Sequence, residues 1–514
     1  MENKIQNESL QESSYQAEST LIQEQSVKHH RKYSHVDSFK KSKWRWIQLI
    51  LISIFNFVCL YGIQVPTPLQ EAIEKSLDIN PNQYNMMQAW FCIPNIILPL
   101  LAGPLSFKVG IKPALFIYGL LMTIGQLIEW LAVRGLHGSY TWSLIGIIIF
   151  GIGSNGGVVL INAFACQWFF GKELSMALAL GNAIQYLGQL AASILLPYLS
   201  ELEINKQEQN GSDGEHVNSL NSAYFISLLI IGFGGLLSVL GMYILDNKAE
   251  KYDKKNNVKP FVEEEDHKIS IKDFKKVFKF GKLFWIVQSM TFFAYICLCY
   301  NNNIDGLLEQ NYAQTNRQSG YYMALQFIIQ LPLTPLLGYY TDLKGKRSLL
   351  AIIGGILNVA QFVIFMVVPT CEDGTCSSAN FIVPLAIGGV ANSFFGAVFQ
   401  AMVALTVPKK DLEISFGVLD GVMQLGNSVG PLLQGPILNN TTKENGFYWF
   451  FVQNLITGLI QLGLSVWIFF YDRVHGKLFE VTEDNEMESG SSNEEEESSQ
   501  LQKEKDLLQE KLIE

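Results

Sequence analysis

Charged residues are scarce in this chain. Only 16% of its 514 residues are Asp, Glu, Lys or Arg, whereas soluble domains carry about 25%. Hydrophobic residues make up 49%, and 33 residues are phenylalanine. This composition excludes an ordinary water-soluble domain, because most of the surface is unsuited to water.

The residue patterns of enzymes and cofactor-binding proteins are also missing. A glycine-rich run, Gly151-Ile152-Gly153-Ser154-Asn155-Gly156-Gly157, lies inside an apolar stretch and has no lysine after it, so it does not resemble a phosphate-binding loop. We find no metal-ligand cluster, catalytic triad or nucleotide site. We therefore predict that the chain is not an enzyme, has no cofactor or metal, does not bind nucleic acid, and draws any energy from a gradient.

Long apolar runs fill most of the sequence instead. Runs of about 20 residues can cross a bilayer as helices, and lipid leaves no alternative for a single segment because it cannot satisfy free backbone groups. We predict an all-α, polytopic membrane protein with about twelve spans, near 45–65, 84–106, 113–134, 141–168, 174–200, 221–246, 283–303, 319–341, 348–369, 381–407, 414–438 and 447–471.

Basic residues indicate the orientation. Lys40, Lys41, Lys43 and Arg45 precede the first span, and the turns after even-numbered spans are also rich in lysine, so we expect both termini to be cytosolic. The first 44 residues lack an apolar segment with a cleavage site, so we expect the first span to be an uncleaved anchor.

Two independent signals fall on the opposite side of the membrane. One is a set of glycosylation sequons, which begin at Asn210, Asn439 and Asn440. The other is the loop from Cys371 to Cys376, where a disulfide would be permitted. The remaining five cysteines lie in apolar spans, and we interpret them as small core residues.

The two halves of the sequence repeat each other. Lys172-Glu173-Leu174 and Lys410-Asp411-Leu412 open the fifth and eleventh spans, and Leu187-Gly188-Gln189 and Leu425-Gly426-Asn427 follow them at the same distance. The offset between halves is close to 236 residues. Parallel repeats of six spans are the architecture of the major facilitator superfamily, with a substrate cavity between the halves. We therefore divide the chain into a cytosolic tail (1–44), a six-helix bundle (45–246), a cytosolic linker (247–282), a second six-helix bundle (283–471) and an acidic cytosolic tail (472–514).

A hinge with one carboxylate, two glycines and a basic end follows the eighth span. Its sequence runs from Gly338 to Arg347 and contains Asp342, Gly345 and Lys346. Glycines permit a tight turn, and the carboxylate can pair with a helix N-terminus or a basic partner. We predict a gating motif at the cytosolic surface; the alternative is a simple basic turn.

Ionisable residues inside the spans are few, and amides take their place. Asp420 is predicted inside the cytosolic half of the eleventh span, where it can hold a substrate amino group or a proton. Buried amides usually join helices. Our substrate-binding candidates on the fourth, fifth and eleventh spans are Asn155, Gln185, Tyr186, Asp420 and Gln424.

Several motifs resemble the lysosomal dipeptide transporters of the major facilitator superfamily. They include the runs Val65–Gln70, Ala89–Asn95, Phe150–Gly153 and Trp168–Leu174, together with Val407-Pro408. The resemblance covers roughly 45–475. It implies a lysosomal or vacuolar membrane uniporter of dipeptides or related compounds, with a glycosylated single-span accessory subunit as a partner.

The sequence departs from that family at charged positions. Where the family has an acidic residue in the fourth span, this sequence has Asn155. Where the family has two arginines, in the fourth and fifth spans, this sequence has Ile147 and Tyr186. Three alternatives stay open: a sugar or organic-anion facilitator, a non-transporting sensor or scaffold of the same fold, and a plasma-membrane location.

Overall fold

The computed structural model describes residues 39–98, 109–134, 139–169, 172–209, 220–256, 274–370, 377–407, 412–440, 446–474 and 479. Each of the twelve predicted spans corresponds to helix in this part of the chain, as expected for apolar runs that must satisfy their own backbone.

The first half begins with a short 3₁₀ turn, η1 (Phe39–Lys41). Its helices are α2 (Trp44–Gln64), α3 (Gln70–Leu77), α4 (Pro81–Cys92), α6 (Ile111–Arg134), α7 (Tyr140–Trp168), α8 (Lys172–Gln209), α9 (Asn221–Leu229) and α10 (Gly235–Lys255). Three short turns complete it: η2 (Thr67–Leu69), η3 (Ile93–Ile96) and the π-helical η4 (Ile230–Gly234), which joins α9 to α10.

The second half repeats this order. Its helices are α11 (Phe274–Val277), α12 (Lys282–Leu298), α13 (Ile304–Tyr312), α14 (Asn316–Lys344), α15 (Arg347–Val367), α16 (Ala379–Leu405), α17 (Leu412–Asn440) and α18 (Gly446–Val474), with the 3₁₀ turn η5 (Cys299–Asn303) between α12 and α13. The predicted seventh span, 283–303, therefore contains both α12 and η5, and the helix resumes beyond it as α13.

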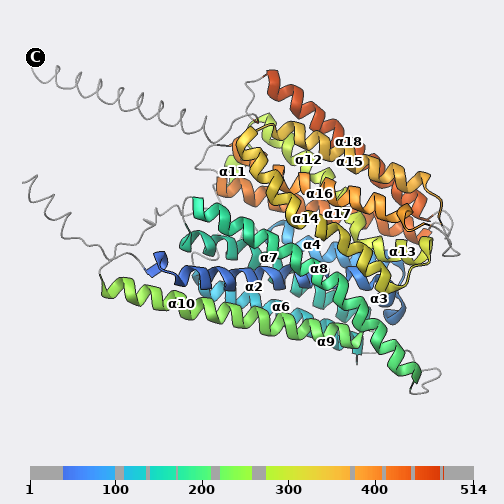
Figure 1. The fold of residues 1–514 in the computed structure, drawn as a ribbon, viewed down its shortest axis with the longest axis horizontal. Helices are drawn as coiled ribbons and strands as arrows, with labels where there is room; N and C mark the ends of the chain where they lie inside the picture. Colours follow the sequence, from blue (N-terminus) through green and yellow to red (C-terminus); the bar gives the residue numbers. More distant parts are fainter. Residues whose placement is uncertain are drawn as a thin grey trace, which may run out of the picture.

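Each half has its own hydrophobic core. In the first half, one large cluster of buried hydrophobic residues lies within 39–249. In the second half, two such clusters lie within 277–479. The two bundles lie side by side in Figure 1, with α4 against α17 and α8 against α14. We call the end that carries α3 and α13 the far end, and the opposite end, with η1 and α11, the tail end.

The helices at the boundary between the halves carry polar residues within their spans. Among the described residues, eight helical stretches are long and apolar enough to cross a membrane; α8, α14 and α17 are not among them, and the described part of α4 has 12 residues. These four carry polar side chains and, in α8, α14 and α17, internal prolines. A span can carry such residues when it faces another protein surface or a water-filled path instead of lipid.

The halves approach closely at two glycines near the far end. A Cβ on Gly320 of α14 would lie 2.7 Å from Cγ of Pro197 on α8 and even closer to the carbonyl oxygen of Ser193. A Cβ on Gly435 of α17 would lie 2.8 Å from Oδ1 of Asn82 on α4. Only glycine, which has no Cβ, permits such close spacing. The crossings of α14 with α8 and of α17 with α4 therefore both require glycine at these positions.

Candidate functional site

A hydrogen bond between amides joins the two halves at the centre of the bundle. Nε2 of Gln424 on α17 donates to Oδ1 of Asn155 on α7 at 2.9 Å. Asn155 in turn donates to the carbonyl of Gly151 at 3.1 Å, which fixes its orientation. Oε1 of Gln424 is buried and accepts no hydrogen bond from the described residues, so an acceptor is left free at the boundary.

Gln185, the third predicted amide, is held by its own half. Its Nε2 donates to Oδ1 of Asn56 on α2 at 3.1 Å, and Asn56 lies against Gly181 of α8. Asn56 was not among the predicted site residues. Its buried place beside Gln185 depends on how α2 packs against α8, which the sequence pattern does not specify.

The predicted Tyr186 meets the second half. Its hydroxyl and the side chain of Thr334 on α14 lie 3.4 Å and 3.2 Å from the point where a Cβ on Gly396 of α16 would stand. Tyr186 of the first half therefore lies beside α14 and α16 of the second half, at the boundary between the bundles.

Asp420 is the carboxylate of this region. It is half-buried on α17, and no hydrogen bond or ion pair with another described residue involves it. A Cβ on the next residue, Gly421, would lie 2.7 Å from the carbonyl oxygen of Ile96 in η3. Asp420 is therefore next to a close contact between α17 of the second half and η3 of the first. Gln424 follows one helical turn later on the same face.

A second group of polar side chains joins the two halves at the far end. The residue with the most contacts in it is Asn303 of η5. This side chain is fully buried. It exchanges two hydrogen bonds with Asn85 of α4, at 2.9 and 3.0 Å, and accepts a third from Gln70 at 3.3 Å. Its Nδ2 also donates to Gln434 of α17 at 3.2 Å. Three of these four bonds cross between the halves, so Asn303 fastens them together.

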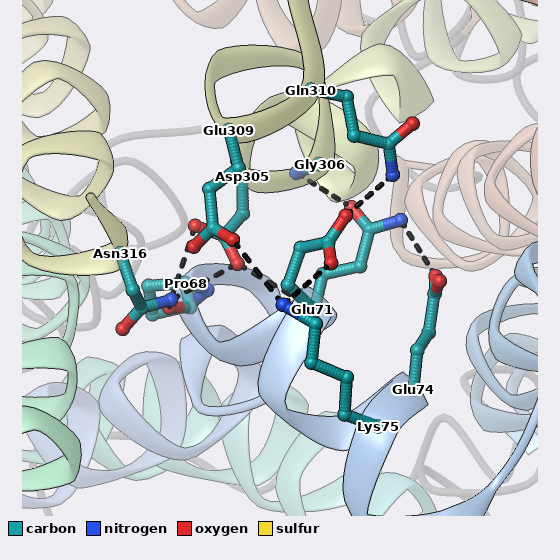
Figure 2. Close-up of polar contacts among 10 residues, drawn as sticks. Pro68, Glu71, Glu74, Lys75, Asp305, Gly306, Glu309, Gln310 and Asn316 are labelled. Carbon is teal, nitrogen blue, oxygen red and sulfur yellow. Dashed lines mark hydrogen bonds and ion pairs between the residues drawn. The ribbon is translucent and has the colours of Figure 1, made fainter. Parts of the chain in front are cut away.

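Several carboxylates lie close together at the same end of the molecule, among them Glu71, Asp305 and Glu309 in Figure 2. Asp305 is fully buried and accepts from the backbone N–H of Glu71 at 3.3 Å and from Asn316 at 3.2 Å. Lys75 lies 3.2 Å from Glu71 of its own helix and 3.9 Å from Glu309 of α13. Gln310 donates to the carboxylate of Glu71, and this contact also crosses between the halves. We call Gln70, Glu71, Lys75, Asn85, Asn303, Asp305, Glu309 and Gln310 the far-end gate.

The far-end gate joins nearly equivalent positions of the two repeats. The backbone N–H of Gly306 donates to Oε1 of Gln70 at 3.3 Å, and these residues are 236 positions apart, whereas the repeated Lys172 and Lys410 motifs are 238 apart. Nearly equivalent positions touch each other only close to the pseudo-two-fold axis that relates the halves. The sequence reasoning missed this site because it ended the seventh span at 303; the offset applied to the end of the first span would have pointed to it.

The predicted gating motif lies at the tail end. Gly345 has φ +64° and Lys346 has φ +54°, so the turn is confined to these two residues. The expectation for Gly338 was wrong: it is helical, because α14 continues to Lys344, and no group stands within 4 Å of where its Cβ would be. Arg347 is buried, Lys346 is exposed, and the Asp342 side chain lies outside the described residues.

The first half has an ion pair with a buried carboxylate at the tail end. Lys112, in the first turn of α6, lies 2.9 Å from Oδ2 of Asp246 on α10. Trp168 of α7 donates its indole N–H to the other oxygen of Asp246 at 3.0 Å. The buried carboxylate thus ties α6, α7 and α10 together at the tail end.

The modification candidates are only partly covered. Asn439 and Asn440 are exposed at the last turn of α17, at the far end. Asn210, Cys371 and Cys376 lie outside the described residues. Within the described ranges, no group of three or more His, Cys, Asp or Glu side chains is arranged to hold a metal ion.

Curated relatives share most of the chain. The lysosomal dipeptide transporter MFSD1 of Mus musculus is 24% identical over 407 residues, which cover 77% of this chain and 80% of that protein. The proteins of the same name from Bos taurus and Homo sapiens are each 23% identical, with the same coverage.

Solved structures agree with the fold. A bacterial homolog of the human lysosomal transporter Spinster, inward-facing and occupied, has a TM-score of 0.60 at 14% identity, and covers 83% of this chain and 97% of its own. A D-xylose–proton symporter has a TM-score of 0.61 at 13% identity, and covers 82% and 96%. The model of the Major Facilitator Superfamily matches residues 49–308 and 291–509. With both halves matched and the boundary helices paired as this fold requires, the chain belongs to the major facilitator superfamily of membrane transporters.

Proposed function

We propose that this transporter carries dipeptides or closely related amino-acid compounds across a lysosomal or vacuolar membrane, as a uniporter that works by alternating access. The similarity to lysosomal dipeptide transporters over 77% of the chain supports the substrate class and the compartment. The side chains of Asn155, Asp420 and Gln424 favour a solute that carries both an ammonium group and amide groups.

The observation that carries this proposal is the Asn155–Gln424 hydrogen bond, with Asp420 one turn away. A free carboxylate on Asp420 can receive the ammonium group of a solute, and the unused Oε1 of Gln424 can accept a peptide N–H. Since the bond joins the halves directly, a solute that replaces it would be held by both bundles. That is the condition for a site to be exposed to each side in turn.

The orientation belongs to the same proposal. We place the tail end in the cytosol and the far end in the lumen, so that Asn439 and Asn440 are available for glycosylation. The turn at Gly345 and Lys346 would gate the cytosolic side, and the far-end gate would close the lumenal side. A glycosylated single-span accessory subunit fits this arrangement as a partner in the membrane.

Counterflow in proteoliposomes tests the proposal. Vesicles loaded with unlabelled dipeptide should take up labelled dipeptide without ATP, and a protonophore should not abolish uptake. Asp420→Asn should lower apparent affinity at least about tenfold, because a hydrogen bond to a charged group contributes about 1.5–3 kcal/mol. Asn358→Ala, a buried amide bonded to Cys297 within one half, is the control.

The outcome also separates the alternatives. Competition by neutral sugars, with unchanged affinity in Asp420→Asn, would favour a sugar facilitator and contradict the assigned role of the carboxylate. Absence of counterflow for dipeptides, sugars and organic anions alike would favour a sensor or scaffold.

A further inference from the structure

A groove runs along the outside of the bundle at the boundary between the halves. It has a volume of about 550 Å³ and is lined by Phe57 of α2, by one face of α8 from Leu187 to Tyr198, and by Tyr321 of α14. Leu187, Ile194 and Tyr198 are each 38% exposed, and Tyr321 is 42% exposed. Apolar side chains exposed on spanning helices face the hydrocarbon of the membrane. The groove is therefore open to lipid.

The length of this groove matches one leaflet. Tyr198 follows Leu187 by eleven positions along α8, which is about 17 Å at a rise of 1.5 Å per residue. The hydrocarbon core of a whole bilayer is about 30 Å thick. Phe57 also lines a second groove, nearer the tail end, so its ring stands between the two. This division favours separate lipid chains over a continuous transmembrane helix as the occupant.

A cation and an anion stand together at the far end of the groove. The guanidinium of Arg317 lies 5.0 Å from the ring centre of Tyr198 and donates through Nε to the hydroxyl of Tyr321 at 3.0 Å. Its Nη1 is 3.7 Å from Oε2 of Glu201, and that oxygen accepts no hydrogen bond from the described residues. Arginine has five N–H donors, and most of those of Arg317 have no acceptor among the residues that the structure describes. Both side chains are about two-fifths exposed.

We propose that this groove binds a phospholipid with a primary ammonium headgroup, of the phosphatidylethanolamine type. One acyl chain lies along α8, the phosphate accepts from the free N–H groups of Arg317, and the ammonium donates to Glu201. The headgroup carries the two charges that complement the rim, and they are at the end of the apolar groove where a headgroup must be. A choline headgroup has no N–H and cannot donate to Glu201.

Such a lipid would hold the two halves together. Its binding surface combines α2 and α8 of the first half with Tyr321 and Arg317 of the second. Close behind the groove, Gly320 packs on Pro197, and this crossing separates if the far end opens. A ligand that binds the closed arrangement better must shift the equilibrium toward it. The lipid therefore stabilises the state in which the far end is closed.

Native mass spectrometry of the full-length protein in detergent tests the headgroup contacts. With phosphatidylethanolamine and phosphatidylcholine of identical acyl chains, we expect preferential binding of the former. Arg317→Met should weaken phosphatidylethanolamine binding at least about tenfold, as expected for the loss of a charged hydrogen-bonding partner. Glu201→Gln should remove the preference between the two lipids. The matched control is Arg134→Met, because Arg134 is at the far end of α6 and stacks on Trp130. This variant should leave the binding of both lipids unchanged.

A second pair of variants tests the groove itself. Leu187→Trp fills it and should reduce the number of retained lipids, whereas Leu237→Trp, on the exposed face of α10, should not. Equal binding of the two headgroups by the unaltered protein, or equal lipid retention by the two tryptophan variants, would overturn the proposal. So would the displacement by Leu187→Trp of a co-purifying single-span protein instead of lipid. These readouts do not depend on which solute is transported.

Discussion

Asn303→Ala should open the far end, because it removes the side chain that fastens the two halves. The variant loses three hydrogen bonds across the boundary, two with Asn85 and one with Gln70. Interhelical hydrogen bonds in membranes contribute about 0.6 kcal/mol each, and buried bonds in general about 1 kcal/mol. The closed state should therefore lose roughly 2–3 kcal/mol relative to the open state. This corresponds to a shift of roughly 30- to 150-fold in the equilibrium.

Distance measurements between spin labels can detect that shift. One label on Leu202 of α8 and one on Tyr448 of α18 report on opposite halves at the far end, and both positions are exposed. In the Asn303→Ala variant the longer-distance population should grow. The control is Asn358→Ala, which removes an equally buried amide whose partner, Cys297, lies in the same half. If both variants give the same distance distribution, Asn303 does not fasten the halves and the gate is misplaced.

Two further substitutions test the same closure. Lys75→Met should also favour the open far end, because Lys75 is the cation placed between Glu71 and Glu309, and removing it leaves like charges facing each other. Lys75→Arg should restore the unaltered distance distribution. Gly320→Val should prevent tight closure, since a Cβ there would clash with the backbone of α8, whereas Gly463→Ala, with open space around it, should leave the distances unchanged. Closure that survives Gly320→Val would refute the close helix crossing.

The spans themselves could be predicted from the sequence with small errors. The eleventh span was expected at 414–438, and α17 covers Leu412–Asn440. This success has a simple cause: an apolar run in lipid has one conformation available, so local sequence decides the structure. The extent of α14 was harder, because its last turn is polar. Gly338 was expected in a turn, yet the helix continues for six residues beyond it.

The candidate site was partly accessible for the same reason. Amides and a carboxylate in apolar spans are costly, so they draw attention to the boundary helices, and Asn155 and Gln424 are indeed in direct contact. Asn56 was missed because its partner, Gln185, is about 130 residues away in sequence. A pattern within one span says that a side chain needs a partner, but it does not say which helix provides it.

The far-end gate shows what a repeat adds to such reasoning. Duplicated halves related by a pseudo-two-fold axis must bring equivalent positions together wherever the axis meets the protein. Gln70 and Gly306 come close to this condition, and the polar residues around them differ between the halves: Glu71 and Lys75 on one side, Asp305 and Glu309 on the other. Carboxylates from both copies meet here, Glu71 from the first and Glu309 from the second, and Lys75 lies within ion-pairing distance of both. Lys75 comes from the first half, and Gln310 of the second half donates to Glu71. The gate is therefore asymmetric although the scaffold is not.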